Sequence, residues 1–152
     1  ILQKNRDLKI IKLDSLSEIN QGLWEGKLGK EIKKDWPNLL KKWIYKPEEV
    51  KMPEGESIKD VSDRSIKAFE EICTSQKNDD SILLVGHNVV NKTLICNILG
   101  IGFSNIWMIK QINGGVTVID IFDDPNKDYV ISALNITSHL EEIIDSTAFG
   151  SI

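Results

Sequence analysis

Apolar residues at helical spacing first appear in residues 27–43, where hydrophobic side chains recur every three or four positions. Lysines fill the positions between them, as expected for the solvent side of a helix. Pro37 interrupts this stretch, and proline disfavours helical backbone in the residue before it. The pattern therefore predicts two short helices that meet near Trp36.

Two longer helices are predicted further along the chain. Ser57 is a typical helix N-cap, and Asp60, three residues later, completes a capping box in front of an apolar stripe that extends to Ile72. Residues 88–99 form a second amphipathic stretch. Gly100 follows it directly, and glycine is the usual residue after the end of a helix.

Four segments have the composition of strands. Residues 8–13 and 81–86 are short apolar runs, and the second shows no alternation, which is typical of a parallel strand buried on both faces. Residues 115–122 and 129–135 are separated by a turn-rich segment at 123–126, which predicts an antiparallel pair. Helices and strands alternate along the chain, so we predict an α/β fold.

Composition limits the classes of partner. The chain has 152 residues with a net charge of -4, which suits one domain and argues against a nucleic-acid or anionic-membrane partner. A small phosphorylated substrate remains compatible, because it needs only a local positive pocket. The polar start and the lack of a long apolar run predict a cytoplasmic protein. Cys73 and Cys96 are expected to be free, buried thiols.

His87 carries the strongest local signal for chemistry. It lies between the predicted strand 81–86 and the helix 88–99, and ligands of open α/β sheets bind beyond the carboxyl ends of strands. The free backbone N–H groups at the start of the helix would suit a phosphate, and Gly86 would leave room for close approach. A histidine that only caps the helix or satisfies core groups fits the pattern equally well.

Glu18 is the second candidate. It lies in a loop between Leu16 and Ile19, and a carboxyl group in apolar surroundings can serve as a proton donor. Most loop glutamates are simply solvated, so this signal is weak by itself. Trp24 and Gly26 indicate that the loop is packed.

Other polar residues favour structural roles. Arg64 could pair with a carboxylate of the preceding loop or with a substrate, and the structural role is favoured. His139 is expected to serve in packing or at the surface. The two histidines lie far apart without clustered acids, so no metal site is predicted. The sequence also contains no phosphate-binding glycine-rich loop.

Three segments together resemble the histidine phosphatase superfamily, the phosphoglycerate-mutase-like proteins. Residues 16–26 are similar to its L-x-E-x-x-x-G-x-W-E-G loop, and residues 53–57 with Arg64 are similar to its P-x-G-E-S…R segment. Residues 84–88 resemble its second-histidine motif. The resemblance implies a three-layer fold, with helices on both faces of a mostly parallel sheet.

The resemblance also implies roles for individual residues. In this family a histidine attacks the phosphoryl group and forms a phosphohistidine, and no cofactor takes part. His87 matches the second active-site histidine, which holds the phosphoryl oxygens, and Asn88 could add a hydrogen bond there. Glu18 matches the general acid that protonates the leaving alcohol. A small phosphorylated metabolite is the implied substrate, and a phosphatase of the broad-specificity or α-ribazole-phosphate type is favoured.

The family's Arg-His-Gly motif, which contains the nucleophile, does not occur in this sequence. We therefore expect residues 1–152 to form a single incomplete domain, with the nucleophile upstream of Ile1 and little or no activity in the chain alone. The tail at 141–152 is expected to be a helical turn followed by disorder. Three alternatives remain open: a phosphoglycerate mutase, a non-catalytic phosphate-binding domain, and one half of a tandem protein.

Overall fold

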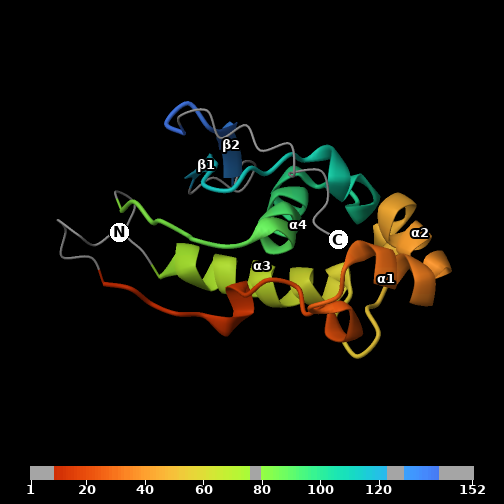
Figure 1. Ribbon diagram of the computed structural model, residues 1–152. Coiled ribbons are helices and arrows are strands. Elements are labelled where there is room, and N and C mark those ends of the chain that lie inside the picture. Colours follow the sequence, from red (N-terminus) through yellow and green to blue (C-terminus); the bar gives the residue numbers. More distant parts are fainter. Residues whose placement is uncertain (1–8, 76–79, 123–128, 141–152) are drawn as a thin grey trace.

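A computed structural model describes residues 9–75, 80–122 and 129–140. In Figure 1, α3 runs across the middle of the view with α4 above it, α1 and α2 lie at the right, and a small sheet lies beside α4. The helices are α1 (Gly29–Asp35), α2 (Pro37–Tyr45), α3 (Ile58–Thr74) and α4 (Asn88–Leu99), joined by the 3-10 turns η1 (Asp14–Leu16), η2 (Gly22–Trp24), η3 (Pro47–Glu49) and η4 (Phe103–Met108). The strands are β1 (Val116–Ile121) and β2 (Tyr129–Ile136).

The predicted break between two short helices is confirmed. The Trp36 N–H closes α1 by donating to the Ile32 carbonyl at 2.8 Å, and the Trp36 carbonyl accepts from the Leu40 N–H of α2 at 2.9 Å. Pro37 is the first residue of α2, where the missing N–H of proline costs no helical hydrogen bond. The chain therefore turns at Trp36 with its backbone groups still paired.

The capping box of α3 is also confirmed. The Ser57 hydroxyl accepts from the Asp60 N–H at 3.2 Å, and the Asp60 carboxylate accepts from the Ser57 N–H at 2.9 Å. These bonds satisfy backbone donors that have no partner within the helix. The hydrogen bonds from the backbone and side chain of Ser57 lower the pKa of Asp60 from 3.8 to about 2.

Ser57→Ala is expected to destabilise the protein by about 1 kcal/mol, the usual cost of losing an N-cap. Since the pKa of folded Asp60 is depressed, its contribution is present above pH 3.8 and is lost as the pH falls toward about 2. Urea unfolding at pH 7 and pH 2 measures this, and the variant should lose less stability than wild type on acidification. Thr74→Ala, at the exposed end of α3, is the control that should change little.

Helix α4 packs against α3 and is buried over most of its length. Its buried side chains include Val90, Ile95 and Cys96, and the Asn97 amide donates to the Ser62 hydroxyl of α3 at 2.8 Å. Gly100 ends α4 in a left-handed conformation with φ 63°, as the sequence predicted. The core continues from α4 through α2, α3 and the loops: Ile19, Trp24, Ile32, Leu40, Trp43, Val50, Met52, Ile58, Val61, Val89, Ile106 and Ile109.

The predicted antiparallel pair is confirmed as β1 and β2. Val116 pairs with Ile136 at one end and Ile121 pairs with Tyr129 at the other, with irregular register near Val118. The turn predicted at 123–126 lies outside the described residues, as does the tail predicted at 141–152. Phe69 of α3 packs against Tyr129 with ring centroids 5.5 Å apart, which joins the pair to the helices.

The strands predicted at 8–13 and 81–86 are not formed in the residues described, which are 9–13 of the first segment and all of the second. Both segments have no assigned secondary structure, and Figure 1 draws both as coil. Ile11, Leu83 and Val85 expose 67%, 63% and 71% of their surface, where a buried strand would expose almost none. A strand needs a neighbour to take its N–H and C=O groups, and no described segment lies in register to provide one. The sheet of the described residues is therefore antiparallel and two-stranded.

The described part of the chain shows the state of both cysteines and whether any helix could cross a membrane. Cys73 and Cys96 are both free, as predicted, although Cys73 is only half-buried. Burial raises the pKa of both thiols, which favours the unreactive protonated form. Among the described helices, none is long and apolar enough to cross a membrane.

Candidate functional site

His87 lies immediately before α4, at the position the sequence predicted for a ligand-binding histidine. Its backbone is extended (φ -112°, ψ -176°), and its carbonyl accepts the first α4 hydrogen bond, from Asn91 N–H, at 3.1 Å. The imidazole does not cap the helix, and it is exposed. Within the described residues it has no hydrogen-bond partner, so the alternative of a capping or core histidine is not supported.

Gly86 allows α4 to begin close to the segment before it. A Cβ atom at this position would lie 2.4 Å from the Asn91 side-chain oxygen, so the Asn91 side chain would have to move to admit it. Glycine therefore leaves room for the Asn91 side chain against the segment that leads into His87.

The Glu18 carboxylate binds the start of the same helix, 71 residues away in the sequence. One oxygen, Oε2, accepts from the Val89 N–H at 3.0 Å, while Oε1 lies 3.1 Å from the same nitrogen and 3.2 Å from the Val90 nitrogen. The Ile19 N–H also donates to Oε1 at 2.9 Å. The structure thus brings together Glu18 and the residues that follow His87, which sequence spacing could not show.

This arrangement is an anion site at a helix N-terminus. The first amides of a helix have no partner within it and carry a partial positive charge, so they bind carboxylates and phosphates. Here the carboxyl group of Glu18 occupies this position. The sequence predicted apolar surroundings for this carboxyl group, and that prediction is wrong, because backbone N–H groups are its immediate contacts.

Asn88 begins α4 next to His87. Its side-chain oxygen is buried and has no hydrogen-bond partner in the described part of the chain. Buried acceptors without partners are uncommon, because burial removes their hydrogen bonds to water and nothing replaces them. The structure does not bring this side chain into hydrogen-bond contact with Glu18.

The loop that carries Glu18 is interlocked with the loop at 53–56. The Leu23 N–H donates to the Pro53 carbonyl, and the Glu56 N–H donates to the Asn20 carbonyl, both at 2.9 Å. Gly22 has φ +55°, and a Cβ there would lie 2.0 Å from the Pro53 oxygen. Trp24 is 2% exposed, which confirms that the Glu18 loop is packed.

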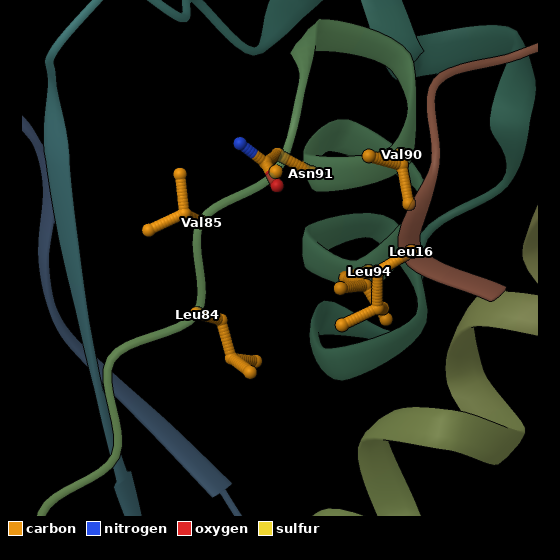
Figure 2. Close-up of a pocket in the computed structure, with 7 residues that line it drawn as sticks. Leu16, Leu84, Val85, Val90, Asn91 and Leu94 are labelled. Carbon is orange, nitrogen blue, oxygen red and sulfur yellow. The ribbon is translucent and has the colours of Figure 1, made fainter. Parts of the chain in front are cut away.

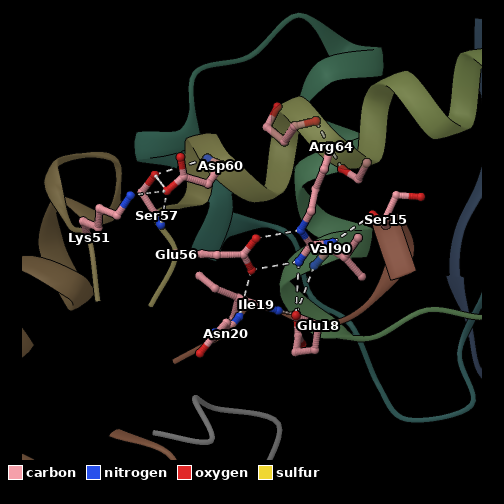
Figure 3. A network of polar contacts seen from close by, with 12 residues as sticks. Ser15, Glu18, Ile19, Asn20, Lys51, Glu56, Ser57, Asp60, Arg64 and Val90 are labelled. Carbon is pink, nitrogen blue, oxygen red and sulfur yellow. Dashed lines mark hydrogen bonds and ion pairs between the residues drawn. The ribbon is translucent and has the colours of Figure 1, made fainter. Parts of the chain in front are cut away.

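Arg64 of α3 pairs with a carboxylate of the loop at 53–56, which confirms the structural role favoured from the sequence. Its Nε and Nη2 atoms donate to the two oxygens of Glu56 at 2.8 and 3.0 Å (Figure 3). The Arg64 hydrogen bonds hold the pKa of Glu56 below its usual value. His139, by contrast, contacts the Gly114 carbonyl at 2.9 Å on an exposed surface, as expected for a packing role.

Lys92 of α4 is a residue the sequence analysis did not single out. It is only 6% exposed, and its ammonium lies 5.0 Å from the centre of the Trp107 ring. Trp107 in turn packs edge-on against Trp43 at 5.0 Å. Burial lowers the pKa of Lys92, and the negative charge of Glu18 opposes that shift. The sequence predicted an amphipathic helix over residues 88–99, but it did not show that Lys92 would lie on the buried side of that helix.

Lys92→Met is expected to raise the free energy of unfolding by about 1 kcal/mol, because an uncharged side chain of similar length avoids the desolvation of the ammonium. Since the pKa of folded Lys92 is lowered, wild type gains stability as the pH rises toward the unfolded value of 10.5. Lys92→Met should show no such rise in stability with pH, because methionine does not titrate. Denaturant unfolding at pH 7 and pH 10 tests both expectations, and a less stable variant at pH 7 would contradict them.

The hollow beside this site is largely apolar. Figure 2 shows it between the segment at 84–86 and α4, with Leu84 directed toward the helix and Val85 directed away. It is lined by Leu16, Leu84, Val85, Gly86, Val90, Asn91 and Leu94. An apolar lining does not suit a phosphate. The described residues also contain no cluster of three or more histidine, cysteine or acidic side chains that could hold a metal ion.

Comparison with known proteins identifies relatives of the chain. The sequence profile of the histidine phosphatase superfamily (branch 1) matches residues 1–136. Phosphoserine phosphatase 1 of Hydrogenobacter thermophilus is 32% identical over 137 residues, which are 90% of this chain and 63% of that protein. A 2-carboxy-D-arabinitol-1-phosphatase of Triticum aestivum is 29% identical over 82% of this chain and 25% of its own length.

Solved structures share the fold. The Bacillus stearothermophilus protein YhfR matches with a TM-score of 0.78 and 27% identity, over 86% of this chain and 63% of its own. The α-ribazole phosphatase of Shigella flexneri matches with a TM-score of 0.74 and 22% identity, over 88% and 64%. These matches confirm the predicted fold class. The present chain spans less than two thirds of the length of each of these proteins.

Proposed function

Because the chain belongs to branch 1 of the histidine phosphatase superfamily, we propose that it is the larger part of a phosphomonoesterase that acts on a small phosphorylated metabolite. One observation carries this proposal: the carboxylate of Glu18 meets the helix that His87 begins. The proposed reaction needs a proton donor, Glu18, near a phosphate-binding group, His87, and Glu18 contacts the Val89 N–H two residues after His87. The relatives named above are phosphatases, which favours hydrolysis over phosphoryl transfer to a second hydroxyl.

In the proposed reaction a histidine nitrogen attacks phosphorus, and the bond from phosphorus to the ester oxygen breaks. The leaving oxygen takes its proton from Glu18 and departs as the alcohol. Water then attacks the phosphorus and gives a proton to Glu18, and the bond from phosphorus to the histidine nitrogen breaks, which releases inorganic phosphate and restores the histidine and the acid. His87 binds the phosphoryl oxygens through its exposed imidazole, and the amide NH2 group of Asn88 donates a hydrogen bond to them.

We place the nucleophilic histidine in a segment upstream of Ile1. The sequence contains two histidines. His87 is assigned to phosphoryl binding, and the His139 ring is hydrogen-bonded to the Gly114 carbonyl. The chain spans 63% of the length of its Hydrogenobacter relative, so that relative has room for a further segment. On this proposal residues 1–152 alone have little or no phosphatase activity.

The test compares two proteins with p-nitrophenyl phosphate: residues 1–152, and the same chain extended by the residues encoded directly before Ile1. We expect turnover only in the extended protein, and we expect His87→Ala to lower it by roughly a hundredfold or more. Robust, His87-dependent turnover by residues 1–152 would refute the upstream nucleophile. An upstream segment without histidine, in an inactive extended protein, would support a non-catalytic phosphate-binding domain instead.

A further inference from the structure

Arg64 and Glu56 contact the loop that carries Glu18, and their hydrogen bonds reach residues on both sides of Glu18 (Figure 3). We infer that this ion pair is a positioning device, which holds the Glu18 carboxyl group at the start of α4 for proton transfer. The inference rests on the proposed function for the chemical role of Glu18. The positioning itself rests on geometry alone.

Arg64 binds the Glu18 loop directly, at two backbone carbonyls. Its Nη1 donates to the Ser15 oxygen at 2.8 Å, and its Nη2 donates to the oxygen of Glu18 itself at 3.1 Å. These carbonyls are 49 and 46 residues away in the sequence. The Arg64 guanidinium therefore links the backbone at Ser15 and Glu18 to helix α3.

Glu56 extends the contact beyond Glu18. Its Oε2 accepts from the Asn20 N–H at 2.9 Å while also accepting from Arg64, and its backbone N–H donates to the Asn20 carbonyl. The loop is thus held before, at and after Glu18. The residues on each side of the acid are bound either by Arg64 or through its partner.

Arginine is suited to this role because its planar fork can serve several acceptors at fixed angles, and a lysine cannot. The side chains of Arg64 and Glu56 are only 22% and 24% exposed, so the pair is better shielded from solvent than a surface ion pair. Position matters for a proton donor, since a displacement of about 1 Å can cost roughly a hundredfold in rate. Arg64 acts through Glu18 and need not touch the substrate.

The first test measures positioning without activity, by hydrogen exchange of backbone amides in residues 1–152. The Val89 and Val90 amides lie in the first turn of α4, where no helical carbonyl can protect them, so their protection depends on Glu18. Arg64→Lys is expected to speed their exchange at least roughly tenfold, the effect of losing a hydrogen bond to a charged group, toward the rate in Glu18→Ala. Amides in the middle of α4, such as Ile95, should stay protected.

Two further variants complete this test. Lys59→Arg is the matched control, because Lys59 forms an exposed pair with Asp63 on the same helix, and it should leave the Val89 and Val90 rates unchanged. Glu56→Gln is the second variant in case Arg64→Lys fails to fold, since its amide places a donor where an acceptor is needed. Wild-type exchange in both Arg64→Lys and Glu56→Gln, with fast exchange in Glu18→Ala, would overturn the inference.

The second test uses the extended, active protein and compares p-nitrophenyl phosphate with an alkyl phosphate. A good leaving group needs little help from an acid, so loss of a proton donor should lower kcat mainly for the alkyl ester. Arg64→Lys should show the same selective loss as Glu18→Gln, to a smaller extent. A general folding defect would instead lower both rates equally.

The outcomes separate the two proposals. A selective loss in Glu18→Gln but an equal loss, or none, in Arg64→Lys would overturn the positioning role and leave the proposed acid intact. If Glu18→Gln lowers the rates for both substrates equally, Glu18 is not the general acid, and the Arg64–Glu56 pair has no role in proton transfer. Selective loss in both variants supports both proposals.

Discussion

Glu18→Gln is expected to slow hydrolysis of an alkyl phosphate by roughly a hundred- to ten-thousandfold in the extended protein, the usual contribution of a general acid. The amide has the same shape, and its oxygen can still accept from the Val89 and Val90 N–H groups. It cannot deliver the proton that the leaving alcohol requires. The loss should therefore appear in kcat more than in KM, as steady-state kinetics would show.

Glu25→Gln is the matched control for this variant. Glu25 lies in the same loop, but it is exposed, and among the described residues its carboxylate accepts only from the nearby Gln21 N–H. Its replacement should leave the rate close to that of wild type, since its hydrogen bond stays within its own loop. Equal losses in the two variants would show that the loop tolerates no change, and the assignment of Glu18 as the proton donor would fail.

Gly22→Ala is expected to destabilise the protein by about 3 kcal/mol, through two costs that add. Gly22 has φ +55°, a conformation that alanine disfavours, and the new Cβ would lie 2.0 Å from the Pro53 oxygen. Neither group can retreat easily, because the Leu23 N–H is bonded to the same carbonyl. Urea unfolding gives the change in free energy.

Gly26→Ala separates these two costs. Gly26 also has a positive φ, +73°, but no atom lies within 4 Å of the position its Cβ would take. It should therefore lose only about 1 to 2 kcal/mol, the conformational part. If both variants lose the same amount, the close approach of the two loops contributes nothing to stability, and the interlock described above is wrong.

The helices could be predicted from the sequence because their signals are local. Pro37, the Ser57 capping box and Gly100 act on backbone within one turn of themselves, and each ends or starts a helix where it was expected. The antiparallel pair was predictable for a similar reason, because β1 and β2 are near neighbours in the chain. Such features do not depend on distant segments.

The strands predicted at 8–13 and 81–86 are absent from the described residues, because a strand, unlike a helix, depends on a second segment. An apolar run shows that a segment favours burial, but a strand forms only when another segment takes its hydrogen bonds. Leu83 and Val85 remain exposed in the described structure, although their sequence is typical of a buried strand. An apolar run therefore favours a buried strand, but it does not form one without a partner segment.

For the candidate site, the sequence by itself determined the two residue types, His87 at a helix start and Glu18 in a packed loop, and it indicated that Arg64 would meet a carboxylate. Only the tertiary structure decided that Glu18 reaches α4, that Arg64 binds the Ser15 and Glu18 carbonyls, and that Lys92 is buried. The physical reason is distance along the chain. Capping and helical spacing act over a few residues, whereas these contacts join segments 46 to 71 residues apart and exist only once the loops and helices have packed.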